Sequence, residues 1–301
     1  MCKLCANVGN VDFLYQKDDK LKPGDVQILQ EWMAKEQHLP KISDYQMLLF
    51  ISSCYYNIQA TKSCLENFYT LKTHCPEFFS GRNLNQESVK THLNTVIAAP
   101  FQQLIPTNNY MVCIVKLHNC KTDTFVFNDT IKVIDMALTI YNQQLGPQEA
   151  HVLIMDGAGL QLGHVLKMNI MSLKKYFIFV QEAMPVRLKQ IHVINVNGIV
   201  EKFVNLVRQC LKKELQEQMY CHSKMESLYK FVPKEVLPKD YGGNELSLEE
   251  LHKNQVENIK EHIDLLIADE DVKSNEQKRV GKAKSLEQFG IQGTFKKLDI
   301  D

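Results

Sequence analysis

The second half of the chain alternates short apolar runs with longer amphipathic stretches. The apolar runs cover residues 111–115, 152–155 and 191–196, and β-branched residues are frequent in them. Runs of this length and composition are typical of strands that are buried on both faces. The intervening residues 130–144 and 165–183 are long enough for helices. Strands that alternate with helices predict an α/β fold with βαβ crossovers and a mostly parallel sheet.

The N-terminal part has helical periodicity instead, over residues 24–80. Ser43 and the following aspartate precede an apolar run at residues 47–50, which is a helix-start signal. Residues 61–71 place their apolar side chains on one face, and Pro76 ends that segment. These features predict a small helical domain in front of the α/β part.

A further amphipathic segment, residues 198–215, follows the third predicted strand. Its apolar positions fall on one broad face and its polar positions on the other. The apolar face carries Ile199, Val200, Phe203, Val204, Leu206, Val207 and Leu211. From Ala268 the chain is polar, which predicts an extended tail. The tail ends in an apolar cluster that could dock on the domain, formed by Phe289, Ile291, Phe295 and Leu298.

Composition narrows the class of protein. The chain has 301 residues, 45% hydrophobic and 23% charged, as expected of a globular protein with a sizeable core. Lys plus Arg and Asp plus Glu both number 35, which argues against a broad basic surface for nucleic acid. No apolar run reaches the roughly 20 residues of a membrane span or follows the N-terminus as a signal peptide would. Nine scattered cysteines suit a reducing compartment, and we expect a cytoplasmic protein.

Motifs for chemistry are weak. The C-x-x-C pair at Cys2 and Cys5 has no second pair to complete a zinc site. Asp156–Gly159 follows a strand but lacks the third glycine of a dinucleotide-binding loop, so a tight turn is the simpler interpretation. His151, His164 and His192 have neither zinc-protease spacing nor a nucleophile elbow beside them. We therefore expect no catalytic residues, no metal and no cofactor.

The segment at residues 165–184 holds more apolar side chains than one helix stripe needs. Either the helix is buried beneath its neighbours, or its second apolar face meets something else that is apolar. Composition alone leaves both alternatives open.

Three motifs then occur in order along the chain. They are D-x-x-G at Asp156–Gly159, the pair formed by Met184–Arg187 and Ile191–Asn195, and L-P-x-x-Y-G-G at Leu237–Gly243. With this order and spacing the sequence resembles the CRAL-TRIO family over about residues 25–245, in its tocopherol- and retinaldehyde-binding branch. The C-terminal Gly293–Leu298 is similar to insect members. The resemblance implies a helical domain at 1–90, a lipid-binding domain at 91–245, and a C-terminal helix and tail at 246–301.

The resemblance also implies a site. It makes residues 198–211 a mobile lid and assigns Arg187 and Lys189 to contact with anionic lipid. The implied ligand-binding residues are Ile134, Leu138, His151, Leu153, Met155, Met168, Tyr176, Phe179, Val180, Val186, Leu188 and Ile191.

The implied function is binding and transfer of a small hydrophobic lipid, such as a tocopherol, retinoid or carotenoid. The protein would act as a monomer that touches membranes transiently. Two alternatives compete: a phospholipid exchanger, disfavoured because His151 and Tyr176 are the only polar pocket positions, and a lipid-modifying enzyme, for which no cofactor motif is visible.

Three departures from the family pattern affect these expectations. Asn197 replaces a proline at the start of the lid, which suggests a looser hinge, and Leu160 replaces a frequent tryptophan. The N-terminal segment at residues 48–54 lacks the family's arginines. With Arg187 and Lys189 as the remaining cations of the headgroup cleft, we expect weak dependence on phosphoinositides.

Overall fold

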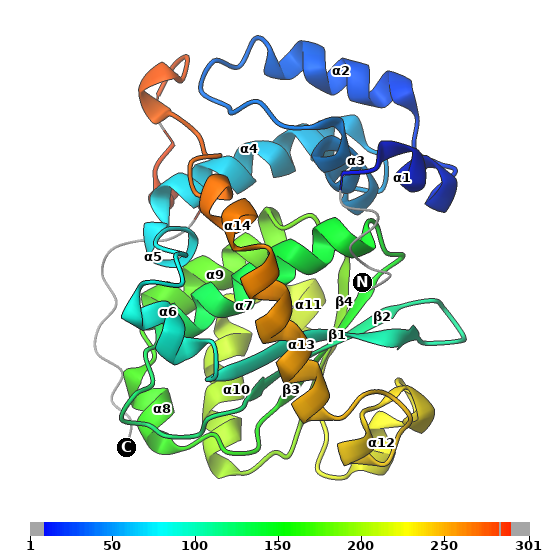
Figure 1. The fold of residues 1–301 in the computed structure, drawn as a ribbon, viewed down its shortest axis with the longest axis vertical. Helices are drawn as coiled ribbons and strands as arrows, with labels where there is room; N and C mark the ends of the chain where they lie inside the picture. The colour runs from blue at the N-terminus through cyan, green and yellow to red at the C-terminus, as the bar shows by residue number, and fades with distance from the viewer. Residues whose placement is uncertain (1–8, 283, 290–301) are drawn as a thin grey trace.

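The computed structural model describes residues 9–282 and 284–289 (Figure 1). The N-terminal part is helical: its first four helices form a layer at one end of a sheet-and-helix body, and two short ones lie along the side of that body. These helices are α1 (Val11–Lys17), α2 (Pro23–Met33), α3 (Asp44–Ser53), α4 (Ile58–His74), α5 (Pro76–Phe79) and α6 (Glu87–His92). Ser43 caps α3 and shares a capping box with Gln46, and Pro76 begins α5 after α4 has ended.

The body is built on a five-stranded sheet of order β1-β2-β3-β4-β5. Its strands are β1 (Val96–Leu104), β2 (Met111–Leu117), β3 (His151–Asp156), β4 (Leu188–Ile194) and β5 (Met219–Cys221). β1 runs antiparallel to β2, and the other neighbouring pairs are parallel.

Helices cover both faces of the sheet. One face packs against α7 (Phe127–Leu145), α9 (Ile170–Glu182) and α10 (Gly198–Cys210), with α8 (Leu162–Lys167) and α11 (Lys213–Gln216) beside them. The other face packs against α12 (Met225–Leu228), the short helix η2 (Lys234–Val236) and α13 (Leu248–Glu261). The remaining described elements are η3 (Lys239–Tyr241), α14 (Ile263–Asp269), η4 (Glu276–Lys278) and η5 (Leu286–Phe289).

This architecture confirms the predicted α/β class with a mostly parallel sheet and a helical N-terminal part. The domain boundaries at residues 90 and 245 stay a prediction. Two details were wrong. The helix expected at 165–183 is interrupted near Met168, because Asn169 accepts hydrogen bonds from the N–H groups of Met171 and Ser172 and starts α9 anew. The helix expected at 198–215 ends at Cys210.

The free edge of β1 is closed by two buried side chains. Gln255 on α13 donates to the carbonyl of Val96 at 3.0 Å and accepts from the N–H of Ala98 at 2.6 Å. Farther along, the carboxylate of Glu245 accepts from the N–H groups of Gln102 and Gln103. These side chains replace the backbone partners that an edge strand lacks.

The segment after residue 268 is not the free extended tail that composition suggested. Ser274 N–H donates to the Tyr69 carbonyl, and Arg279 pairs with Glu66 on α4. Phe289 packs on the core of the body. Ile291, Phe295 and Leu298 lie outside the described residues. None of the helices in the described part of the chain has the length and apolarity to cross a bilayer.

Candidate functional site

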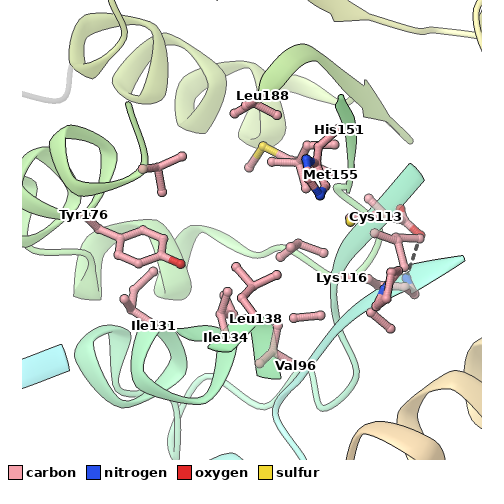
Figure 2. Close-up of a pocket in the computed structure, with 18 of the residues that line it drawn as sticks. Val96, Cys113, Lys116, Ile131, Ile134, Leu138, His151, Met155, Tyr176 and Leu188 are labelled. Carbon is pink, nitrogen blue, oxygen red and sulfur yellow. Dashed lines mark ion pairs between the residues drawn. The ribbon is translucent and has the colours of Figure 1, made fainter. Parts of the chain in front are cut away.

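A largely apolar cavity of about 210 Å³ lies between the sheet and the helices α7, α9 and α10 (Figure 2). The strands provide one wall and the helices the opposite wall. Lys116, paired with Asp156, marks one side of the view, and Tyr176 extends from α9 on the other.

The sheet wall follows directly from strand register. Pro100, Cys113 and Leu153 pair across β1, β2 and β3 in one row, and Ala98, Val115 and Met155 form the next. All six line the cavity, because side chains two residues apart in a strand point to the same face. His151 lies two residues before Leu153 on this same face.

A β-bulge in β4 extends the wall. Leu188 pairs with His151 and Gln190 pairs with Val152, so Lys189 is the extra residue. The bulge lets Leu188 and Ile191, three residues apart, face the same side. Leu188 lines the cavity, whereas Ile191 is fully buried in the surrounding core and is not a lining residue.

The wall opposite the sheet is formed by four segments. On α7 the lining positions Ile131, Ile134 and Leu138 recur at helical spacing, and α9 contributes Tyr176 and Val180. The stretch between α8 and α9 contributes Met168, and the turn before β4 contributes Val186.

Of the predicted ligand-binding residues, all but Phe179 and Ile191 line the cavity. Phe179 lies on the far side of α9, where its ring packs 5.4 Å from that of Phe68 and 4.7 Å from that of Phe79. The assignment of Phe179 and Ile191 to the lining was therefore wrong. Sequence reasoning also missed β1, whose Ala98-Ala99-Pro100 run gives no strand signal, and Ile131, which the spacing along α7 could have revealed.

Two buried polar atoms in the lining have no hydrogen-bond partner among the described residues: the hydroxyl of Tyr176 and Nδ1 of His151. Figure 2 shows the Tyr176 hydroxyl pointing into the space between helices and sheet. Burial raises the pKa of Tyr176 well above its usual value, so the phenol keeps its proton. Burial, together with Lys17 and Arg187, lowers the pKa of His151 to about 4. The cavity thus offers two neutral polar groups to a ligand.

His164 and His192 do not join His151. His192 lies on the opposite face of β4, where its Nδ1 is 2.9 Å from Nε2 of His222. His164 is buried against the ring of Phe125. Both residues are buried in the core.

Asp156 joins the three sequence motifs at one end of the cavity. Asn195 donates to its carboxylate at 2.7 Å, Tyr241 donates at 2.5 Å, and Lys116 pairs with it at 2.9 Å. Burial alone would raise the pKa of Asp156, but these hydrogen bonds and that of the Ala158 N–H lower it overall. The three sequence motifs therefore meet at the Asp156 carboxylate, which we call the Asp156 joint. D-x-x-G contributes Asp156, Ile191–Asn195 contributes Asn195, and L-P-x-x-Y-G-G contributes Tyr241.

The segment predicted to be a lid forms α10, and its apolar face packs over the cavity. Val200 and Phe203 line the cavity, while Val204, Val207 and Leu211 are buried in the core around it. Ile199 and Leu206 are half-buried.

Both ends of the lid are fastened. Asn197, in place of the family's proline, accepts hydrogen bonds from the N–H groups of Ile199 and Val200. A side chain at Gly157 would come within 2.6 Å of Val200, so the glycine lets the lid dock closely. At the other end, Gln181 on α9 donates to the Cys210 carbonyl and accepts from the Lys212 N–H.

Arg187 does not lie where an anionic membrane could reach it. Only 6% of the residue is exposed, and its Nε donates to the Ser52 carbonyl at 2.9 Å. The guanidinium also contacts the Glu149 carbonyl and stacks 4.3 Å from the ring of Tyr55. The assignment of Arg187 to membrane contact was therefore wrong, because it joins the N-terminal helices to β4. Lys189 is exposed beside Tyr55.

Two family profiles match this chain. The profile "Pinta-like, UBA domain" covers residues 18–89, the N-terminal helices, and the profile "CRAL/TRIO domain" covers residues 107–243. The second range holds the sheet from β2 onward, the cavity helices and the Asp156 joint. Residues 107–243 of this chain belong to the CRAL-TRIO family. Members of this family bind and transfer lipids.

Known relatives point to one branch of the CRAL-TRIO family. The chain is 24% identical over 236 residues to the mouse (Mus musculus) "Alpha-tocopherol transfer protein-like" protein, covering 77% of this chain and 68% of the relative. It is 25% identical over 225 residues to the human (Homo sapiens) protein of that name, covering 73% of this chain and 64% of the relative. The chain thus spans about two thirds of the length of these relatives. A solved structure, "Crystal structure of Sfh5", matches with a TM-score of 0.47 and 14% identity over 86% of this chain and 99% of that one.

Proposed function

We propose that this CRAL-TRIO protein binds one small neutral lipid in the cavity and carries it between membranes in the cytosol, without chemical conversion. The observation that carries the proposal is an apolar cavity with two unpartnered polar atoms, closed by a helix with one apolar face. An apolar wall binds the hydrocarbon, and the hydroxyl of Tyr176 or Nδ1 of His151 orients a single polar group.

The charge of the cavity supports a small neutral lipid over a phospholipid. Among the described residues that line it, Lys116 is the one lysine or arginine, and Asp156 neutralises it at 2.9 Å. A phosphate headgroup would therefore find no free cation.

Binding energy and release follow from the same geometry. Burying about 500 Å² of apolar ligand surface contributes roughly 12 kcal/mol before entropy costs, which is ample for tight binding. Release requires an apolar destination, which a membrane supplies, and the apolar face of α10 can enter the interface when it leaves the cavity.

The first prediction identifies the cargo. Organic extracts of the protein, purified without detergent from a eukaryotic host, should contain about one equivalent of an isoprenoid or similarly apolar molecule per chain. Mass spectrometry of the extract makes the measurement, with a protein lacking a lipid cavity purified in parallel as the control. Recovery of phospholipid alone, together with no binding of fluorescent tocopherol or retinoid analogues, would contradict the proposal and favour a phospholipid exchanger.

The second prediction concerns the polar handle. Tyr176→Phe should weaken binding of a lipid alcohol such as retinol or tocopherol roughly fivefold, because a hydrogen bond contributes about 1 kcal/mol. Binding of an analogue in which hydrogen replaces the hydroxyl should not weaken, since the apolar wall is intact. Fluorescence titration of both ligands against both proteins gives the comparison. An equal loss for the two ligands would mean that the substitution acts through packing.

A further inference from the structure

Three metal-binding side chains converge outside the lipid cavity, at the end of β2. His118 follows the last residue of this strand, and Glu249 and His252 lie on α13. One ligand atom from each side chain lies within 4.8 Å of the other two. The sequence predicted no metal site, because His118 lies more than 130 positions from Glu249 and His252.

Local structure explains why they meet. Glu249 and His252 are three residues apart on a helix, so they share one face. α13 packs along β1, where Gln255 bonds the strand edge. The N–H of His118 donates to the Thr95 carbonyl, just before β1 begins, which holds His118 beneath the start of α13.

A backbone hydrogen bond already orients the ring of His252. Nε2 of His252 lies 3.2 Å from the Leu93 carbonyl, and a carbonyl oxygen only accepts hydrogen bonds. The proton is therefore on Nε2, and the lone pair of Nδ1 remains for a metal. A backbone carbonyl behind the distal nitrogen is the usual support of a metal-binding histidine.

The side chains of His118 and Glu249 are free to bind a metal ion. Both His118 and Glu249 are exposed, and neither has a side-chain hydrogen bond or ion pair within the described residues. The helix start does not need Glu249, because the adjacent Glu250 forms the capping box with Ser247. The ring of His118 stacks on that of His252 with centroids 3.9 Å apart.

We propose that His118, Glu249 and His252 bind one zinc ion, with water completing the coordination. Two imidazoles and a carboxylate form a ligand set that zinc accepts in tetrahedral geometry. Bonds of about 2.0–2.1 Å place tetrahedral ligand atoms roughly 3.4 Å apart, so the set must contract by up to about 1.4 Å. The ring of His118 must also rotate out of its stack on His252, because the lone pair of each imidazole lies in its ring plane. The exposed side chains of His118 and Glu249 supply that movement. The ion would join the end of β2 to α13 and hold the C-terminal helix against the sheet.

Zinc titration of the full chain by calorimetry tests the site. The titration uses a Cys2→Ser, Cys5→Ser background, which removes the C-x-x-C thiols as competing ligands. One equivalent should bind, and the melting temperature should rise with zinc. His118→Gln and Glu249→Gln should each weaken binding at least roughly tenfold, the usual scale for losing a ligand contact. Glu257→Gln, an exposed carboxylate on the same helix, is the matched control and should change nothing.

Visible spectra of the cobalt-substituted protein provide a second readout. A nitrogen and oxygen ligand set gives weak d–d bands without the intense near-ultraviolet band of thiolate ligation. Three results would overturn the proposal: no zinc binding in the Cys2→Ser, Cys5→Ser background, unchanged binding in both His118→Gln and Glu249→Gln, or a thiolate band in the cobalt spectrum of that background.

Discussion

Phe203→Asp should slow lipid transfer between vesicles by roughly tenfold or more while leaving the protein folded. Phe203 lies on the apolar face of α10 and lines the cavity, so in the proposed cycle it leaves the ligand and enters the membrane interface. An aspartate at an apolar membrane contact costs at least about 1.4 kcal/mol, which is a factor of ten in rate. Transfer of a fluorescent lipid from protein to acceptor vesicles makes the measurement.

Two further variants separate membrane contact from damage to the cavity. Asn205→Asp puts the same carboxylate on the exposed face of α10 and should transfer at the parent rate. Leu206→Asp alters a half-buried lid position that does not line the cavity, so it should slow transfer without weakening lipid binding in solution. If Phe203→Asp and Leu206→Asp both transfer normally, the apolar face of the lid does not meet the membrane.

Arg187→Ala should lower the free energy of unfolding by about 3 kcal/mol. The substitution removes the Arg187 hydrogen bonds to the buried Ser52 carbonyl, which keeps the one from the Tyr55 N–H, and takes the guanidinium from its contacts with Glu149 and Tyr55. Loss of a buried charged partner is among the more costly substitutions known. Denaturant unfolding followed by circular dichroism gives the value. Lys189→Ala is the control, because Lys189 is exposed, and it should change stability by less than about 0.5 kcal/mol.

Arg187→Ala and Lys189→Ala also test whether lipid transfer depends on phosphoinositides in the acceptor membrane. Because Arg187 is buried, acceleration of transfer by phosphatidylinositol bisphosphate vesicles should be small in the parent protein and should not depend on Arg187. A large acceleration that Lys189→Ala abolishes would show that a headgroup cleft survives around Lys189.

The stability prediction for Arg187 has its own contrary outcome. If Arg187→Ala unfolds with the same free energy as the parent protein, the contacts of Arg187 with Ser52 and Tyr55 are energetically neutral.

The sheet and its cavity wall were predictable because short, continuous apolar runs rich in β-branched residues are typical of buried strands. The core runs that became β2, β3 and β4 are buried on both faces, and their register places Cys113, Leu153 and Met155 on one wall. β5 is only three residues long, and β1 carries Pro100, so neither gave a usable pattern. The family motifs located the Asp156 joint, although sequence alone could not say that three motifs share one carboxylate.

The incorrect assignments of Phe179, Ile191 and Arg187 share a physical cause. A side chain's position along a helix or strand does not say which neighbour covers it. Phe179 faces Phe68 and Phe79 because the N-terminal helices occupy that side of α9, and Ile191 lies beneath the helices on its face of the sheet. Arg187 looked like a surface cation because its partners, Ser52 and Tyr55, lie in a distant part of the sequence. Each outcome depended on tertiary packing.

The hydrogen bonds that Gln255 and Glu245 make along β1 also have a consequence between molecules. An open strand edge is a template on which a strand of a second chain can add, and repeated addition leads to aggregation. Here side chains from α13 and the segment before it occupy the donors and acceptors of Val96, Ala98, Gln102 and Gln103. By occupying this edge, α13 and the segment before it hinder self-association through the sheet. They leave the sheet face that lines the cavity free for the ligand.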